Sequence, residues 1–223
     1  MRSSLSQARL SRYTAQQLNT FFPDENPVES SDLAPFLTQV FEKLSRCFSG
    51  LGIPYFWKDG EPYFNHLHSE QYAMYLYVLG NTVFQQGMDV QCIAVKSYLL
   101  NKALHGLEVF YEIQLPEVFW FAHAIGSVLG RASYGNRIAV MQGCTIGNKG
   151  GVYPIFGERV VLCAGSTVLG GVIGSDVCIG AGSLLVNETV PDSCTVVGSS
   201  PHVRILRKRS ALLDTYFPQN FGG

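Results

Sequence analysis

Apolar side chains recur every six residues through residues 122–186, and small residues fill the positions between them. The series continues beyond an irregular break at 148–154 and takes one five-residue step after Val168. A period of six differs from the 3.6 of a helix and from the 2 of a half-buried strand. It is the hexapeptide signature of a parallel β-helix, in which six residues form one side of a triangular coil and the periodic side chain points inward. The inward positions predicted in this way are Val128, Tyr134, Val140, Ile146, Phe156, Leu162, Val168, Ile173, Ile179 and Leu185.

The chain before this region shows helical patterns instead. Between residues 32 and 48, apolar side chains fall at i, i+3, i+4, i+7 and i+8, which places them on one face of a helix. The predicted helices are 5–22, 32–48 with Ser31 or Asp32 as N-cap, one that begins at Ser69, and one capped by Asp89 that ends at Gly106. We therefore predict an α+β chain with a helical N-terminal domain at 1–106, a C-terminal parallel β-helix at 107–205 and a tail at 206–223.

Composition and charge exclude several functional classes. The 16 Lys and Arg residues nearly balance the 17 Asp and Glu residues, so no basic surface is expected to neutralise nucleic-acid phosphates. No apolar run is long enough to span a membrane, and the N-terminus lacks the apolar core of a secretory signal. The six cysteines show no CxxC spacing, which favours buried reduced thiols over a metal or disulfide framework. These features predict a cytoplasmic protein that uses no metal.

His123 is the strongest candidate for chemistry. It follows Ala122, which we take as an inward residue, so its side chain is expected on the outside of the prism, where neighbouring subunits of a β-helix trimer would meet. An imidazole titrates near neutral pH and can act as a general base, best when a carboxylate orients it. The carboxylates close in sequence are Glu112, one short coil earlier, Glu108 and Glu117, and spacing alone does not choose among them.

The periodic region resembles the serine acetyltransferase branch of the hexapeptide acyltransferases. Their HATG-aliphatic-VVG element is matched by HAIGSVLG at 123–130, and their Q-x-x-T-aliphatic-G element by QGCTIG at 142–147. IGAGS recurs at 179–183, and GSSPHVRI at 198–205 matches the closing G-x-P-A-x-aliphatic element with one extra residue. The resemblance covers about 75–205 and is strongest between 122 and 190.

This resemblance implies a trimeric left-handed β-helix with acetyl-CoA bound between two subunits, and it leaves open whether trimers pair into hexamers through the helical domain. His123 would be the catalytic base, and Glu112 would replace the aspartate of the family motif V-D-I-H-P. The implied reaction is O-acetyl transfer, with a backbone N–H near Gly147 or Asn148 stabilising the oxyanion. Backbone groups expected to hold acetyl-CoA lie at Gly147, Asn148, Ala164, Gly165, Ala181 and Gly182.

Departures from the family motifs concern the acceptor. Tyr153 stands where the family has a histidine that receives the serine carboxylate, and the segment before the third helix lacks the family's DPA motif, although Glu70 falls close to its aspartate. We therefore expect the acceptor to be a sugar hydroxyl of a surface polysaccharide (capsule or lipopolysaccharide) or its precursor, with serine as the alternative. His68, Glu70 and Tyr153 are the expected acceptor contacts, whereas His66 and His68 could also cap a turn.

Two other classes compete with acetyl transfer. Some hexapeptide β-helices are hydratases that hold a metal with three histidines, but only His123 lies on the coils before the closing segment. A non-catalytic scaffold on the same prism is the other alternative. Binding of CoA would separate an acyltransferase from a scaffold.

Overall fold

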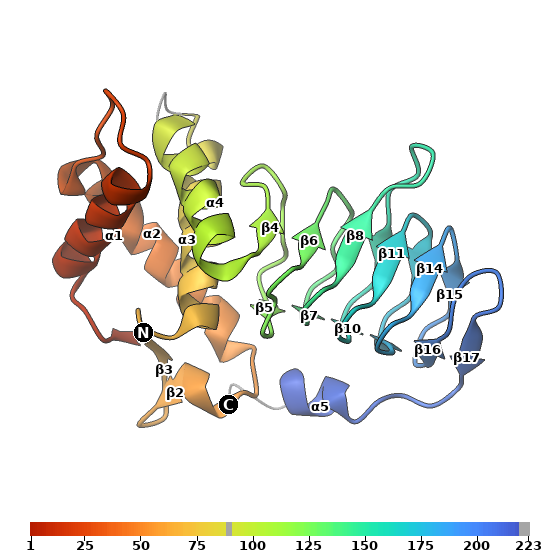
Figure 1. Cartoon of the computed structure of the whole chain (residues 1–223). Coiled ribbons are helices and arrows are strands. Elements are labelled where there is room, and N and C mark those ends of the chain that lie inside the picture. The colour runs from red at the N-terminus through yellow and green to blue at the C-terminus, as the bar shows by residue number, and fades with distance from the viewer. Residues whose placement is uncertain (88–90, 219–223) are drawn as a thin grey trace.

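The computed structural model describes residues 1–87 and 91–218, in which a helical region is followed by a β-solenoid (Figure 1). The predicted order of four helices and then parallel coils is confirmed. The expected Asp89 cap lies outside the described residues. The four helices are α1 (Gln7–Phe21), α2 (Ser30–Ser49), α3 (Ser69–Gln85) and α4 (Gln91–His105).

Helix α2 follows its apolar periodicity, because the side chains at the predicted spacing are buried. Its start differs from the prediction, since the N-cap is Glu29 rather than Ser31 or Asp32. The Asp32 carboxylate reaches back and accepts the Glu29 backbone N–H at 2.8 Å, which completes a capping box. The N-cap was misplaced because Asp32 acts from the third helical position.

Helix α3 lies at the centre of the helical region. Every residue from 70 to 83 is buried, since α2, α4 and the first solenoid strand all pack against it. The chain reaches α3 through a short 3-10 turn, η1 (Pro54–Phe56), and a small sheet of β1 (Arg2–Ser3), β2 (Trp57–Lys58) and β3 (Glu61–Phe64). This route places the first turn of α3 beside the first coil.

The solenoid has three faces, each a ladder of short strands that pair in parallel. The first face is covered by α3 at one end and by the C-terminal segment farther along. It contains β5 (Phe119–Phe121), β7 (Ile138–Val140), β10 (Val160–Leu162), β13 (Val177–Ile179) and β16 (Thr195–Val197). The second face contains β4 (Glu108–Val109), β6 (Val128–Leu129), β8 (Thr145–Gly147), β11 (Thr167–Leu169) and β14 (Leu184–Val186). The third face contains β9 (Ile155–Phe156), β12 (Val172–Ile173) and β15 (Thr189–Val190).

The predicted phase of the repeat holds from Tyr134 onward, but it is wrong on the first coil. Leu129 pairs with Ile146 and is 2% exposed, whereas Val128, the predicted inward residue, is 38% exposed. Phe121 rather than Ala122 is in register with Val140. The cause is the corner between the first and second faces. It spans residues 122–127 on the first coil but only 141–144 on the next, so the first corner is two residues longer.

The C-terminal segment turns back along the solenoid. Strand β17 (Arg204–Leu206) pairs antiparallel with β16, and α5 (Leu212–Tyr216) then lies against β10 and β13 on the way to the helical region (Figure 1). Leu213 and Phe217 are fully buried there. Among the described residues, no helix is both long and apolar enough to cross a membrane.

Candidate active site

His123 sits on the long corner of the first coil in an uncommon backbone conformation. Its φ is 50°, in the left-handed region, and the Ile125 N–H donates to the His123 carbonyl oxygen at 2.6 Å, which closes a tight turn. A non-glycine residue held there costs about 1–3 kcal/mol and persists only when its surroundings impose it. Here the His123 backbone N–H donates to a carboxylate oxygen of Glu70 at 3.2 Å.

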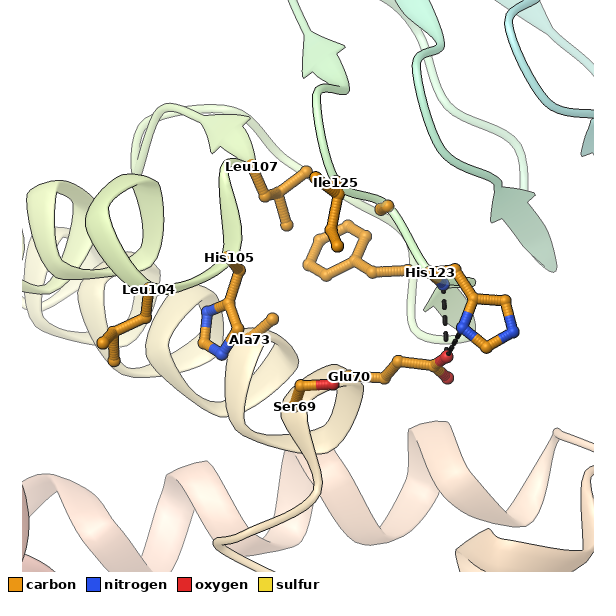
Figure 2. A pocket seen from close by; sticks show the side chains of 10 residues that line it. Ser69, Glu70, Ala73, Leu104, His105, Leu107, His123 and Ile125 are labelled. Carbon is orange, nitrogen blue, oxygen red and sulfur yellow. Dashed lines mark hydrogen bonds and ion pairs between the residues drawn. The ribbon is translucent and has the colours of Figure 1, made fainter.

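Glu70 is a buried carboxylate in the first turn of α3, with 5% of its surface exposed. Its Oε2 accepts hydrogen bonds from the Tyr55 hydroxyl at 2.5 Å and from the Trp120 indole N–H at 2.8 Å. Its Oε1 accepts the His123 backbone N–H and faces His123 Nδ1 at 2.8 Å (Figure 2). A buried charge is tolerated when its lone pairs are taken by donors and the helix N-terminus adds a favourable dipole. Glu70 meets both conditions.

This arrangement assigns the two ring nitrogens of His123. Because Nδ1 faces a carboxylate, it carries the proton and donates to Glu70, which leaves the lone pair on Nε2. Nε2 lies on the ring edge away from Glu70, and 78% of the side chain is exposed (Figure 2). The imidazole is therefore anchored on one side and accessible on the other, which is the geometry that a general base requires.

The expected pairing of His123 with Glu112 needs correction. Glu112 lies in the turn between β4 and β5, and its carboxylate faces Arg131 at 3.4 Å on the next coil. The other two candidates also have cationic partners, since Glu108 pairs with Lys102 at 2.7 Å and Glu117 with Arg46 at 3.1 Å. The carboxylate that meets His123 comes from the helical region, because α3 packs against β5.

A cavity of about 130 Å³ opens beside this pair, between the start of α3, the end of α4 and the first coil. Most of its wall is hydrocarbon, and its charged group is the already satisfied carboxylate of Glu70. Figure 2 shows the lining side chains and the imidazole of His123 at one edge. The lining residues are Ser69, Glu70, Ala73, Leu104, His105, Leu107, Phe121, His123, Ala124 and Ile125.

His105 contributes a neutral imidazole to this cavity. The Asn101 side-chain amide donates to the Ala73 carbonyl oxygen at 3.0 Å, so its own oxygen is the acceptor that faces His105 Nδ1 at 2.8 Å. Burial lowers the pKa of His105 to about 4, so the ring is uncharged at neutral pH. His105 therefore does not act as the cation expected at the end of α4, and no cationic side chain lines the cavity among the described residues.

Two of the expected acceptor contacts lie away from His123 within this chain. The His68 ring stacks on the Tyr55 ring with centroids 4.4 Å apart, so it supports a residue that holds Glu70 and does not line the cavity. Tyr153 is 47% exposed on the loop after β8, at the corner between the second and third faces. His123 is at the corner between the first and second faces, on the other side of the second sheet (Figure 1).

The corners below His123 form a column of bare backbone. Gly126, Gly143, Gly165 and Gly182 have φ values of 75°, 66°, 69° and 69°, and their backbones stack closely from coil to coil. Of the residues expected to bind acetyl-CoA, Ala164, Gly165, Ala181 and Gly182 lie in this column. Gly147 and Asn148 lie instead at the loop-bearing corner with Tyr153.

Sequence reasoning missed the roles of Trp120 and Tyr55. Trp120 was considered as a ring on which a sugar could stack, but it is 5% exposed and its indole N–H is committed to Glu70. The available signal was chemical, since a buried tryptophan usually finds an acceptor for its N–H. Among the described residues, no three His, Cys, Asp or Glu side chains are grouped to share a metal ion.

The comparisons with known proteins point in one direction. No protein-family model matches the chain. A serine acetyltransferase of Staphylococcus aureus strain N315 is 28% identical over 138 residues, which are 59% of this chain and 63% of that protein. A serine acetyltransferase of Synechococcus elongatus is 37% identical over 105 residues, 44% of this chain and 43% of that protein. The chain thus matches less than two thirds of the length of these curated relatives.

Solved structures extend the likeness to the whole fold. The serine acetyltransferase of Neisseria gonorrhoeae superposes with a TM-score of 0.69 at 22% identity, covering 98% of this chain and 85% of that one. The enzyme of Brucella abortus, solved in complex with coenzyme A, has a TM-score of 0.69 at 18% identity over 93% of this chain and 84% of that one. The resemblance read from the motifs at 123–130 and 142–147 is thereby confirmed. By its sequence relatives and its fold, the chain is a serine acetyltransferase-like protein of the hexapeptide-repeat β-helix class.

Proposed function

We propose that this chain is an acetyl-CoA-dependent O-acetyltransferase that uses a Glu70–His123 pair. The observation that carries the proposal is the imidazole held at Nδ1 by a buried carboxylate, 2.8 Å away, with Nε2 left open at the head of the glycine column. The relatives named serine acetyltransferase support the reaction class. Such a pair lets one histidine take and return a proton without a covalent acyl-enzyme.

The proposed reaction is a direct transfer. His123 Nε2 removes the proton of the acceptor hydroxyl as that oxygen attacks the thioester carbonyl carbon. The carbon–sulfur bond then breaks, and the imidazolium returns the proton to the departing thiolate, which yields CoA and the acetyl ester. Glu70 holds the ring in the required tautomer and offsets the positive charge that the ring acquires during transfer.

We further propose that acetyl-CoA lies along the glycine column and that a second subunit completes the site. Glycine corners without side chains let a pantetheine arm approach backbone groups, and the position of a Cβ at Gly182 has no atom within 4 Å. Tyr153, Gly147 and Asn148 lie at a different corner from His123 in the same chain, so they would reach acetyl-CoA or the acceptor only from a neighbouring copy. This supports the expected trimer. Light scattering with and without CoA would distinguish a trimer from a hexamer.

L-Serine is the first acceptor to test, because the curated relatives reported above are named serine acetyltransferases. The sugar acceptor expected from the sequence has no counterpart in their names. One structural observation keeps an uncharged acceptor as the second candidate: the cavity beside His123 offers no cation among the described residues to pair with a carboxylate. A desolvated carboxylate without a partner is costly.

CoA release with L-serine and with a panel of free and nucleotide-linked sugars tests the proposal. We expect turnover with at least one acceptor and a loss of about a thousandfold in His123→Ala. Turnover with L-serine alone would select serine, whereas turnover with sugars alone would select the second candidate. Absence of acceptor-dependent CoA release in the wild-type protein, or near-normal turnover in His123→Ala, would refute the function.

A further inference from the structure

The C-terminal segment connects the far end of the solenoid to the candidate active site. We call residues 204–218 the C-terminal strap. The strap begins as β17 on the last coil and ends beside the helical region, so it spans the first face lengthwise (Figure 1). Along the way the Lys208 carbonyl oxygen accepts the Thr195 hydroxyl at 2.9 Å, and α5 packs on β10 and β13.

Four charged side chains fasten the middle of the strap to the coils. Arg159, whose side chain is 9% exposed, faces Asp176 at 3.3 Å and Asp214 of the strap at 3.0 Å. Arg209 of the strap faces the same two carboxylates, at 3.4 Å and 2.6 Å. Partial burial opposes the charge on Asp214, but the two guanidinium groups outweigh this effect and hold the pKa of Asp214 below its usual value. The strap is thus clamped between two coils before it reaches the helical region.

The end of the strap contacts both structures that hold Glu70. The Tyr216 ring meets the Trp120 ring edge-on, with centroids 4.8 Å apart and planes at 89°. The Tyr216 carbonyl oxygen accepts the Gly52 N–H at 2.9 Å. This approach is close, because a Cβ at Gly52 would lie 2.4 Å from the Thr215 carbonyl oxygen. Three residues after Gly52, Tyr55 donates its hydroxyl to Glu70.

A continuous series of contacts therefore runs from the strap to the imidazole. Tyr216 packs on Trp120, the Trp120 N–H donates to Glu70 Oε2, and Glu70 Oε1 binds His123 Nδ1. Without the Tyr216 ring, the indole would lose one wall of its packing and with it the fixed direction of its N–H. Precise placement of a general base affects turnover strongly, because displacements near 1 Å reduce rates by about a hundredfold.

We propose that Tyr216, at the end of the C-terminal strap, is a positioning residue for the Glu70–His123 pair. This inference rests on the proposed acetyl transfer. The strap fixes the direction of the Trp120 N–H and of the segment that leads to Tyr55, so that Glu70 keeps both oxygens in place for His123. Tyr216 touches neither substrate, and its effect reaches the reaction only through Trp120 and Glu70.

The test compares three substitutions in the full chain. Tyr216→Leu removes the edge-on ring contact, whereas Tyr216→Phe retains it. Tyr98→Leu is the matched control, because Tyr98 makes a similar edge-on contact with Phe110, at 5.3 Å and 88°, away from the pair. We expect Tyr216→Leu to lower kcat about tenfold with the KM for acetyl-CoA unchanged. Tyr216→Phe should restore kcat to within about twofold of wild type, and Tyr98→Leu should leave it there.

A second readout does not depend on activity. The chain has two tryptophans, so the indole N–H of Trp120 can be followed by NMR, and its exchange with solvent should be faster in Tyr216→Leu than in Tyr216→Phe. A wild-type protein without transferase activity would refute the proposed function, while this exchange rate would still test the positioning contact. Unchanged exchange would overturn the inference.

The kinetic results can also overturn it. A kcat for Tyr216→Leu within twofold of wild type would do so, as would an equal loss in Tyr98→Leu or in Tyr216→Phe. If Tyr216→Leu does not fold, Arg209→Met takes its place, because it loosens the strap at the partly exposed charge cluster. We expect a two- to threefold loss of kcat in Arg209→Met, and wild-type kcat in that variant would reject the strap's role.

Discussion

The corner that carries His123 and the corner on the next coil turn the chain at the same edge of the prism in different ways. The later corner spans residues 141–144 and uses Gly143, with φ of 66°, stacked on the glycine below. The first corner spans residues 122–127 and contains two left-handed residues, His123 and Gly126. The extra length pushes an imidazole out of a regular coil. The repeat thus supplies a rigid edge, and the departure from the repeat supplies the chemistry.

The two corners also differ in what stabilises them. The later corner is held within the solenoid, where Gly143 N–H donates to the Ile125 carbonyl oxygen and Gly165 N–H to that of Gln142. The His123 corner is held from outside the solenoid, by the Glu70 carboxylate of α3. The helical region is therefore a structural part of the site, and removal of its carboxylate should affect the first corner alone.

The largest effect is expected from replacement of the imidazole without change to the corner. Asparagine tolerates the left-handed conformation, so His123→Asn should fold with the same turn but lack a base. We expect kcat to fall about a thousandfold, measured as CoA release with the acceptor found in the panel. Ser193→Asn, at an exposed corner with φ of 56°, is the control and should keep wild-type kcat. Comparable losses in both variants would mean that backbone strain, not the imidazole, is responsible.

A smaller effect is expected when a later corner acquires a side chain. Gly182→Asn places an amide in the open space above the column, where acetyl-CoA is proposed to lie. We expect the Kd for CoA to rise about tenfold, which corresponds to about 1.4 kcal/mol, as measured by calorimetry. Gly60→Asn, with φ of 77° and equally open surroundings, is the matched control in the β2–β3 turn. Unchanged CoA affinity in Gly182→Asn would place acetyl-CoA elsewhere.

The smallest effect concerns stability against pH near the His123 corner. Because burial lowers the pKa of His105 to about 4, the unfolded chain binds this proton at higher pH than the folded chain does. The contribution of His105 is complete above pH 6.5 and is lost as the pH falls toward 4. We expect wild type to lose about 2 kcal/mol more unfolding free energy than His105→Gln between pH 7 and 4, measured by urea unfolding. The exposed His202→Gln is the control, and parallel pH profiles for wild type and His105→Gln would contradict the assignment.

The fold was accessible from the sequence because its signals are local. A six-residue period and a helical period each repeat within a short window, and the motif at 123–130 singled out His123 directly. The phase of the first coil was not accessible. Residues 118–122 are all apolar, so nothing in that run distinguishes Phe121 from Ala122 as the inward residue before the long corner.

The partner of His123 was not accessible for a different reason. Glu70 and His123 are 53 residues apart, and their contact depends on how α3 docks against β5 rather than on any repeat. Glu112 was favoured because it lies close in sequence and fits a family motif, but a cation on the next coil occupies it. The strap likewise depends on long-range packing, since Tyr216 meets Trp120 only after the chain has returned along the whole first face.

The most direct test of this account is the kcat of Glu70→Gln measured beside that of Glu112→Gln. Both substitutions preserve side-chain size and remove one negative charge, and circular dichroism checks that both variants are folded. We predict that Glu70→Gln lowers kcat by about a hundredfold, because the amide no longer orients and balances His123, and that Glu112→Gln stays within about twofold of wild type. A large loss in Glu112→Gln together with near-normal turnover in Glu70→Gln would contradict the assignment of Glu70 as the partner of His123.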